Sequence, residues 1–103
     1  HMYTVHMSEF KFEWDESKAR SNLQKHSVSF DEAKSTFYDE QAIVYFDPDN
    51  SDEEERFILL GTSHKLKQLV VCHCLRENES KIRIISARKA DKQESKSYWE
   101  NQK

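Results

Sequence analysis

The chain has 103 residues, enough for one domain with a single modest core, which excludes a second domain. Aromatic residues make up 12% of it and it has one glycine and one proline, so a disordered chain is excluded despite a mean hydropathy of −0.96. The formal net charge is −3, but six acids lie within 47–55, which leaves 16 basic against 13 acidic residues elsewhere, so a local anion-binding surface is not excluded.

Targeting and terminal segments give only general expectations. Residues 1–7 are interpreted as a tag remnant or disordered start that includes a candidate native start, Met7, and 8–103 as the folded domain. No stretch resembles a secretory leader or the run of about 20 apolar residues that crosses a bilayer. The default expectation is a cytoplasmic protein without membrane contact.

The first predicted elements are a strand and two capped helices. Aromatic residues alternate with charged ones over 9–14, which predicts a strand with one buried face. Asp15 then has the position of an N-cap for a helix that reaches about His26. "SFDE", 29–32, has the spacing of a capping box and predicts a second helix to about Tyr38.

The rest of the chain predicts four strands and a last helix. The strands are expected at 42–46, 56–61, 68–75 and 81–87. Short polar connections between them favour an antiparallel meander. Asp91 has cap spacing for a C-terminal helix anchored by Tyr98 and Trp99. The order β-α-α-β-β-β-β-α predicts an α+β domain with the helices on one side of an antiparallel sheet.

A polar stripe follows the first predicted helix. Lys18, Asn22 and Lys25 recur at i, i+4 and i+7, and His26 ends the helix. An ordinary solvated face explains the two lysines as well as a binding site does, and His26 fits a helix-end interaction as well as chemistry. Asn is a middling helix former, so the position of Asn22 predicts a hydrogen-bonding role.

The strand at 68–75 carries "CHC", which raises the question of a zinc site. Neighbouring strand residues point to opposite faces, so His73 cannot join both Cys72 and Cys74, and the chain has no other cysteine. We therefore expect no metal site, and the two cysteines are too close along one strand to form a disulfide. His73 has two interpretations that stay open: a satisfied core histidine, or an acid/base group on a sheet face.

Three cationic residues belong to the last predicted strand or its end. "KIRIISARKA" places Arg83 inside the strand, then Arg88 and Lys89. A guanidinium in an apolar strand needs a partner, either a carboxylate such as Glu55 or a bound phosphate. If the "RENES" turn puts His73 opposite Arg83, both side chains share one face, and a shift of one residue separates them.

No P-loop, GxGxxG, GxSxG or HExxH motif occurs. The remaining His, Lys, Arg and Glu residues suit metal-free proton transfer and phosphate stabilisation, as RNA cleavage by the adjacent 2′-hydroxyl requires. They suit a salt-bridged interaction surface equally well. The residues alone leave both classes open.

Four blocks resemble, in order, the BrnT family, toxins of bacterial type II toxin-antitoxin systems. They are "FEWDESKARSNLQKHSVSFDEA", "DPDNSDEEERFILLGTS", "LVVCH" and "IRIISARKA". The resemblance implies a RelE-like fold and a ribonuclease that arrests translation without a cofactor. It also implies a BrnA-like antitoxin partner with a ribbon-helix-helix part, through which alone operator DNA is bound.

The expected site residues are positions that match the family's pattern, together with Lys89, and their roles are a hypothesis built on that match. The expected catalytic residues are His26, Lys25, His73, Arg83 and Glu55. The expected RNA-binding residues are Lys18, Asn22, Arg56, Arg88 and Lys89. These roles need Lys25, His73 and Arg83 to converge on one hollow, where a histidine moves the proton and the cations hold the phosphate. Products would be a 2′,3′-cyclic phosphate and a 5′-hydroxyl.

Two points qualify these expectations. Ser27 stands where the family has Gly after the Lys-His pair, so the turn that presents His26 is expected to differ, because a left-handed conformation costs Ser more than Gly. The alternative function is a non-catalytic interaction protein that acts as a co-repressor within the toxin-antitoxin complex. Direct DNA binding by this chain alone is disfavoured, because no helix is strongly basic along one face.

Overall fold

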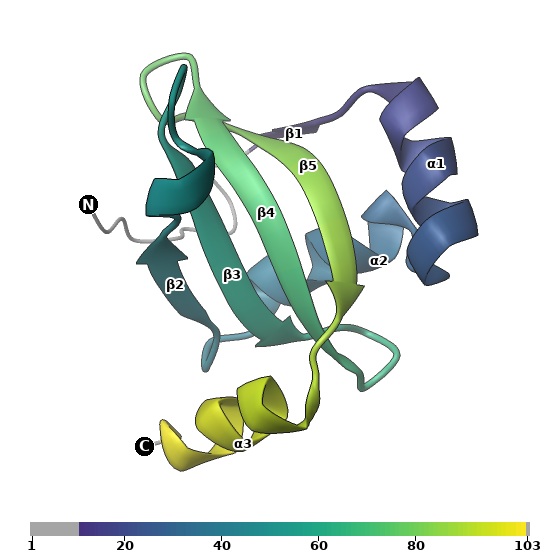
Figure 1. Cartoon of the computed structure of the whole chain (residues 1–103), viewed down its shortest axis with the longest axis vertical. Coiled ribbons are helices and arrows are strands. Elements are labelled where there is room, and N and C mark those ends of the chain that lie inside the picture. The colour runs from purple at the N-terminus through teal and green to yellow at the C-terminus, as the bar shows by residue number, and fades with distance from the viewer. Residues whose placement is uncertain (1–10, 103) are drawn as a thin grey trace.

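A five-stranded sheet forms the centre of the computed structural model, which describes residues 11–102 (Figure 1). The predicted tag remnant, 1–7, and the start of the strand predicted at 9–14 lie outside these residues. The strand order is β1-β5-β4-β3-β2. The strands are β1 (Lys11–Glu13), β2 (Ile43–Phe46), β3 (Arg56–Thr62), β4 (Gln68–Arg76) and β5 (Lys81–Lys89).

Three α-helices begin where local capping chemistry predicts. They are α1 (Glu16–His26), α2 (Phe30–Ser35) and α3 (Lys92–Glu100), with short 3₁₀ turns η1 (Thr36–Tyr38) and η2 (Pro48–Asn50). The side chains of Asp15, Ser29 and Asp91 accept hydrogen bonds from backbone amides in the first turn of α1, α2 and α3, respectively.

The predicted capping box of α2 is wrong in one of its two bonds. The Ser29 hydroxyl accepts from the Glu32 amide at 3.0 Å, as expected. The Glu32 carboxylate, however, is buried and accepts from the Ser63 hydroxyl at 2.7 Å. It thereby joins α2 to the turn between β3 and β4.

The prediction of a wholly antiparallel sheet is also wrong. Strands β2 to β5 form the expected antiparallel meander, but β1 pairs parallel with β5, with Lys11 opposite Lys81 and Glu13 opposite Arg83. No hairpin turn joins β1 to β5, so no local geometry fixes their relative direction. The fold is mixed α+β.

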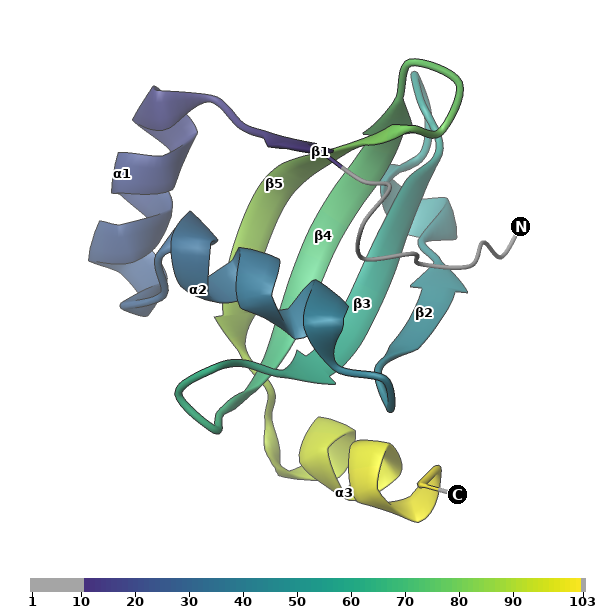
Figure 2. The ribbon, with the colours of Figure 1, turned by 180° about the vertical axis from the view of Figure 1, so that it is seen from behind.

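Both faces of the sheet carry helices, which corrects the expected one-sided arrangement. Helices α1 and α2 cover one face (Figure 2), where Phe30 and Phe37 pack with sheet residues such as Leu59 and Val71. Helix α3 covers one end of the other face, where Tyr98 packs with the β3–β4 pair. The rest of that second face, which we call the open face, is left for the candidate site.

Of the two predicted anchors of α3, only one is buried. Tyr98 is 3% exposed, and its hydroxyl donates to the Asp39 carboxylate at 2.5 Å. Trp99 is 59% exposed and packs edge-on against the Tyr98 ring, so it is not a core anchor.

Candidate functional site

Strand pairing gathers polar and cationic side chains on the open face. In antiparallel strands, directly opposite residues point to the same side. Cys74 lies opposite both Arg56 of β3 and Arg83 of β5, so all three share a face. By the same rule, Arg88 shares the face of Val70.

A β-bulge in β5 shifts the register in the middle of this face. Cys72 pairs with Ser86 and His73 pairs with Ile84, which leaves Ile85 as the extra residue of β5. Both Ile85 and Ser86 consequently line the hollows described below. The register that would place His73 opposite Arg83 does not occur, because the hairpin side of this bulge pairs Cys74 with Arg83 and His73 with Ile84.

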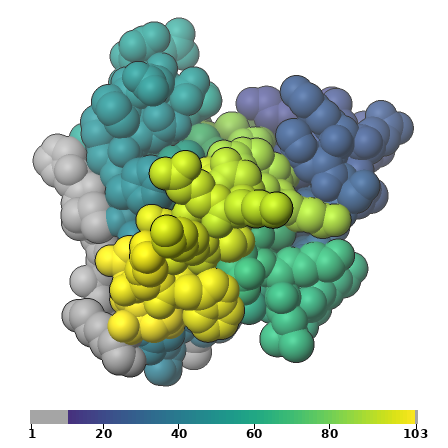
Figure 3. Space-filling view, turned by 60° about the horizontal axis from the view of Figure 1, so that its bottom comes forward, coloured from purple at the N-terminus to yellow at the C-terminus, as the bar shows by residue number. Residues whose placement is uncertain are grey.

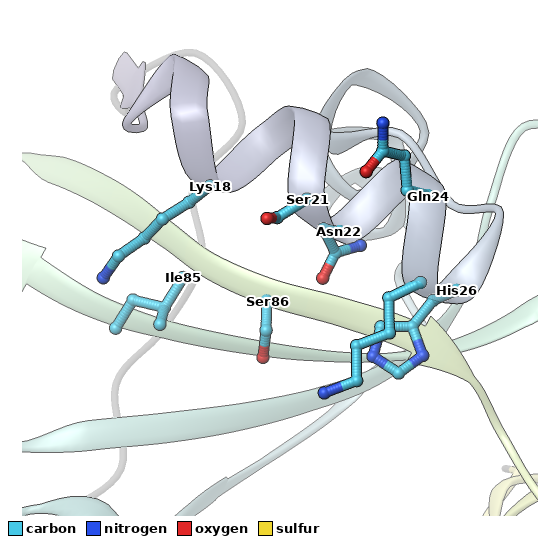
Figure 4. Close-up of a pocket in the computed structure, with 8 residues that line it drawn as sticks. Lys18, Ser21, Asn22, Gln24, His26, Ile85 and Ser86 are labelled. Carbon is cyan, nitrogen blue, oxygen red and sulfur yellow. The ribbon is translucent and has the colours of Figure 1, made fainter.

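The first hollow, which we call the α1 hollow, lies between α1 and β5 and has a volume of about 500 Å³. Its polar wall comes from α1, and its other side from the bulge in β5 (Figure 4). Figure 4 shows Lys18 extending from α1 toward Ile85, with His26 at the far end of the helix. The α1 residues that line it are Lys18, Ser21, Asn22, Gln24, Lys25 and His26.

A second hollow of about 340 Å³, the central hollow, continues from the first across the open face. The two share His26, Ile85 and Ser86, so the His26 ring belongs to both walls. In the space-filling view, the teal segment between β2 and β3 and the blue α1 stand on either side of the yellow-green end of β5 (Figure 3). The other lining residues of the central hollow are Asp47, Asn50, Arg56, Ile58, Val70, Cys72, Ala87 and Arg88.

Asn22 holds α1 against β5. Its amide nitrogen donates to the carbonyls of Val28 (3.0 Å) and Ala87 (2.8 Å), and its amide oxygen accepts from the Ala87 N–H (3.0 Å). Strand β1 pairs with β5 only as far as Arg83, so beyond that point the Asn22 amide takes the place of a neighbouring strand. The predicted hydrogen-bonding role is confirmed, but its partners are backbone groups of this chain.

The turn that presents His26 keeps the left-handed conformation that Gly would adopt, so the expectation that Ser27 changes this turn is wrong. Ser27 has φ 58° and ψ 29°, in the left-handed region, and its N–H donates to the Leu23 carbonyl at 2.9 Å. This bond ends α1 and leaves the half-buried His26 at its last turn. An L residue in this conformation carries a steric cost that Gly avoids.

His73 lies in the core, on the face that α2 covers. Its side chain is fully buried, and its ring packs edge-on against Phe37 with centroids 4.9 Å apart. Burial lowers the pKa of His73 to about 4, so the ring is neutral at pH 7. The predicted convergence of Lys25, His73 and Arg83 is therefore wrong, because His73 is buried on the opposite face and Arg83 does not line the hollow to which Lys25 belongs.

Two of the predicted arginines have carboxylate partners. Arg83 donates to Glu13 at 2.8 Å and so joins β5 to β1. Arg88 makes two bonds of 2.8 Å with Glu94 of α3, where it also lines the central hollow. The hydrogen bond from Arg83 lowers the pKa of Glu13, and that from Arg88 lowers the pKa of Glu94.

Of the other residues predicted to act on RNA, one lines the central hollow and two lie outside both hollows. Arg56 lines the central hollow, whereas Glu55 and Lys89 line neither hollow and are exposed. Lys89 lies opposite Leu69, on the face that α1 and α2 cover. Asp47 and Asn50 line the central hollow, although sequence analysis assigned "DPDN" (47–50) no functional role. The three side chains with acceptor oxygens among these four residues could have indicated a binding site.

The cysteines are ordinary thiols in this environment. Burial raises the pKa of Cys72 to about 11 and raises that of Cys74 as well, so both are protonated at neutral pH. Within residues 11–102, no group of three or more His, Cys, Asp or Glu side chains is placed to hold a metal ion.

Comparison with known proteins identifies the family. The family model described as "Ribonuclease toxin, BrnT, of type II toxin-antitoxin system" matches residues 14–94. The chain belongs to the BrnT family. BrnT proteins are ribonuclease toxins of type II toxin-antitoxin systems, which implies an antitoxin partner.

A solved BrnT structure agrees with this assignment. The crystal structure of the Brucella abortus ribonuclease toxin BrnT matches with a TM-score of 0.58 and 25% sequence identity, over 77% of this chain and 94% of that one. No curated protein sequence matches this chain. Among the described residues, no helix is long and apolar enough to cross a membrane.

Proposed function

We propose that this BrnT-family chain is an endoribonuclease that cleaves RNA without a metal ion, arrests translation, and uses His26 as its proton-transfer group. Membership of a ribonuclease toxin family supports the reaction class. The observation that supports the location is the position of His26 in the wall shared by the two hollows. An RNA strand that crosses both hollows passes this ring with cationic side chains on either side.

The proposed reaction needs one base, one acid and positive charge at the phosphate. The His26 imidazole removes the proton from a 2′-hydroxyl, whose oxygen attacks the adjacent phosphorus while the bond to the 5′-oxygen breaks. The Lys25 ammonium gives a proton to that leaving oxygen. Lys18, in the wall of the α1 hollow, stabilises the negative charge that develops on the phosphate. The products are a 2′,3′-cyclic phosphate and a 5′-hydroxyl.

Other predicted residues have different parts in this proposal. Asn22 and Arg83 hold α1 and β1 in place, and Arg88 adds positive charge at the rim while it fixes α3. His73 has no direct role because its ring is buried on the other face.

The activity test uses purified, antitoxin-free protein and RNA in the presence of EDTA. We expect cleavage, and a loss of about 100-fold or more in His26→Ala, since general acid–base groups contribute about 10²–10⁴-fold. His64→Ala is the matched control, because His64 is exposed and lines neither hollow. Lys25→Ala and Lys65→Ala form a second pair of the same design.

The chemistry of the ends tests the mechanism. The 5′ ends should accept phosphate from a polynucleotide kinase directly, and the 3′ ends should resist polyadenylation until the cyclic phosphate is removed. If the wild-type protein, like the variants, leaves the RNA intact, the alternative is favoured: a non-catalytic protein that acts within a repressor complex.

For the partner, we propose a BrnA-like antitoxin with a ribbon-helix-helix part. It would block RNA cleavage when added in equal amount, and operator DNA would be retarded in gels only when the antitoxin is present. DNA retardation by this chain alone contradicts that part of the proposal.

A further inference from the structure

The central hollow has features that the cleavage chemistry does not need. Its floor is apolar, made by Ile58, Val70 and Ile85, while its rim carries a carboxylate, an amide and a guanidinium. A phosphate site has no use for an apolar floor or for the negative charge of Asp47. A flat ring with polar edges fits this combination better.

The Asp47 carboxylate and the backbone of Arg56 are held in a fixed relation. The Asp47 N–H donates to the Arg56 carbonyl at 2.9 Å, and the Arg56 N–H donates to the Ser51 hydroxyl at 2.9 Å. The Asn50 amide donates to Asp47 Oδ2 at 3.0 Å, which orients the carboxylate. The Asp47 carboxylate, an acceptor, therefore faces the central hollow from the turn that ends in η2, and Arg56, a donor, faces it from the start of β3.

Arg56 has a donor that the described part of the chain leaves unused. Its Nε is buried and has no hydrogen-bond partner among the described residues, and its nearest carboxylate contact, with Glu54, is 3.8 Å long. Buried polar atoms almost always have a partner, so this donor shows that the described residues leave the hydrogen bonds of the Arg56 guanidinium incomplete, in a side chain that lines the central hollow.

The four RNA bases differ in how they fit an acceptor-only carboxylate and a donor-only guanidinium. Guanine alone has two adjacent donors on one edge, N1–H and the N2 amino group, which a carboxylate accepts together. Its other edge has two acceptors, O6 and N7, which are the usual partners of an arginine. Adenine, cytosine and uracil each present a single donor group with an acceptor beside it, so they leave the Asp47 carboxylate poorly matched.

We propose that the central hollow is a guanine-binding subsite, with Asp47 accepting from N1–H and N2 and Arg56 donating to O6 or N7. The inference rests on the proposed function for its RNA substrate, and it assigns that substrate class: RNA with a guanosine next to the cleaved phosphate. Because His26 belongs to both hollows, a base in the central hollow lies beside the phosphate at His26.

Tyr45 provides a platform at the edge of this subsite. It lies directly opposite Ile58, which is part of the floor, and its side chain is 42% exposed. Bases commonly stack on exposed aromatic rings of RNA-binding proteins.

The test measures binding of nucleoside 3′-monophosphates, which need no cleavage, to the whole chain by calorimetry. We expect guanosine 3′-monophosphate to bind about tenfold or more tightly than the adenosine, cytidine and uridine compounds. Inosine, which lacks the N2 amino group, and 7-deazaguanosine, which lacks N7, should each lose part of this advantage. Equal affinity for all four standard nucleotides overturns the inference.

Two variants of the same turn locate the selectivity. Asp47→Asn replaces an acceptor by a donor at constant shape and should abolish the guanosine preference. Asp49→Asn makes the same chemical change in an exposed side chain outside the hollow and should keep it. Circular dichroism checks that both variants are folded; a preference that survives in folded Asp47→Asn overturns the assignment.

Failure of the subsite and failure of the ribonuclease proposal give different results. Cleavage of RNA regardless of base, without nucleotide selectivity, rejects the guanine subsite and keeps the enzyme. Guanosine selectivity that depends on Asp47, in a protein that leaves RNA intact, keeps the subsite and rejects the enzyme.

Discussion

The Asn22 side chain gives the sharpest prediction about stability, because three hydrogen bonds between α1, β5 and the turn before α2 depend on it. Asn22→Ala removes all three and leaves the Ala87 N–H and two carbonyls without these partners. Each bond is worth about 1 kcal/mol net, and the gain in helix propensity returns about 0.5 kcal/mol. The free energy of unfolding should therefore fall by about 2.5 kcal/mol, which lowers Tm by roughly 10–20 °C.

The assay is urea unfolding followed by far-ultraviolet circular dichroism, with Gln24→Ala as the control. Gln24 lies on the same helix and is exposed, so its replacement should leave the free energy of unfolding within about 0.5 kcal/mol of wild type. A loss in Asn22→Ala no larger than that of the control would refute the view that this amide holds α1 on the sheet.

A second substitution separates lost bonds from lost packing. Asn22→Asp keeps the shape and the acceptor for the Ala87 N–H, but it sets an oxygen against two carbonyls. Burial beside carbonyls raises the folded-state pKa of this Asp above its unfolded value. The folded state then binds more protons, so the stability deficit should shrink as the pH falls toward about 4.

Three further predictions concern separate parts of the molecule. Ser27→Gly should raise the free energy of unfolding by about 0.5–1 kcal/mol in the same urea assay, because Gly adopts the left-handed conformation without steric cost. An unchanged or lower free energy of unfolding contradicts the claim that Ser27 is strained in this turn. The hydrogen bond from Arg88 lowers the folded-state pKa of Glu94 below 4.5. The stabilising contribution of ionised Glu94 is therefore present above pH 4.5 and is lost as the pH falls through the lowered pKa. Glu94→Gln should flatten that part of a curve of unfolding free energy against pH. Tyr45→Ala should weaken RNA binding about tenfold, as measured by fluorescence anisotropy. Tyr38→Ala is the control, because the Tyr38 ring is similarly exposed but lies next to Phe12 on the other face, and it should leave RNA binding unchanged. Equal effects of the two substitutions contradict stacking of a base on Tyr45.

Local chemistry allowed the helices to be predicted from the sequence. Asp15, Ser29 and Asp91 each satisfy amides within three residues, so their effect does not depend on distant parts of the chain. The direction of β1 was predicted wrongly because it is decided by pairing across the fold with β5. Nothing near β1 in the sequence records that partner.

The candidate site was predictable where it lies on one helix. Lys18, Lys25 and His26 line the same hollow because helical spacing alone aligns them. His73 and Arg83 do not share a face, because the β4–β5 hairpin pairs Cys74 with Arg83, one residue away from the register that would bring them together. Short apolar strands do not fix such a register from the sequence alone. Asp47 was missed because a turn motif predicts backbone shape and says little about which hollow its side chains enter.

The bulge at Ile85 makes the length of β5 as important as its composition. Before it, Ile82 and Ile84 enter the core while Arg83 faces outward; after it, Ala87 enters the core while Ser86 and Arg88 face outward. If β5 kept its present length but paired without the bulge, inside and outside would exchange over the second half of the strand, and the Arg88 guanidinium would enter the hydrophobic layer. Deletion of Ile85 alone would remove the bulge and keep Ala87 inward and Arg88 outward, so relatives with this architecture can lose the bulge only together with one residue of β5.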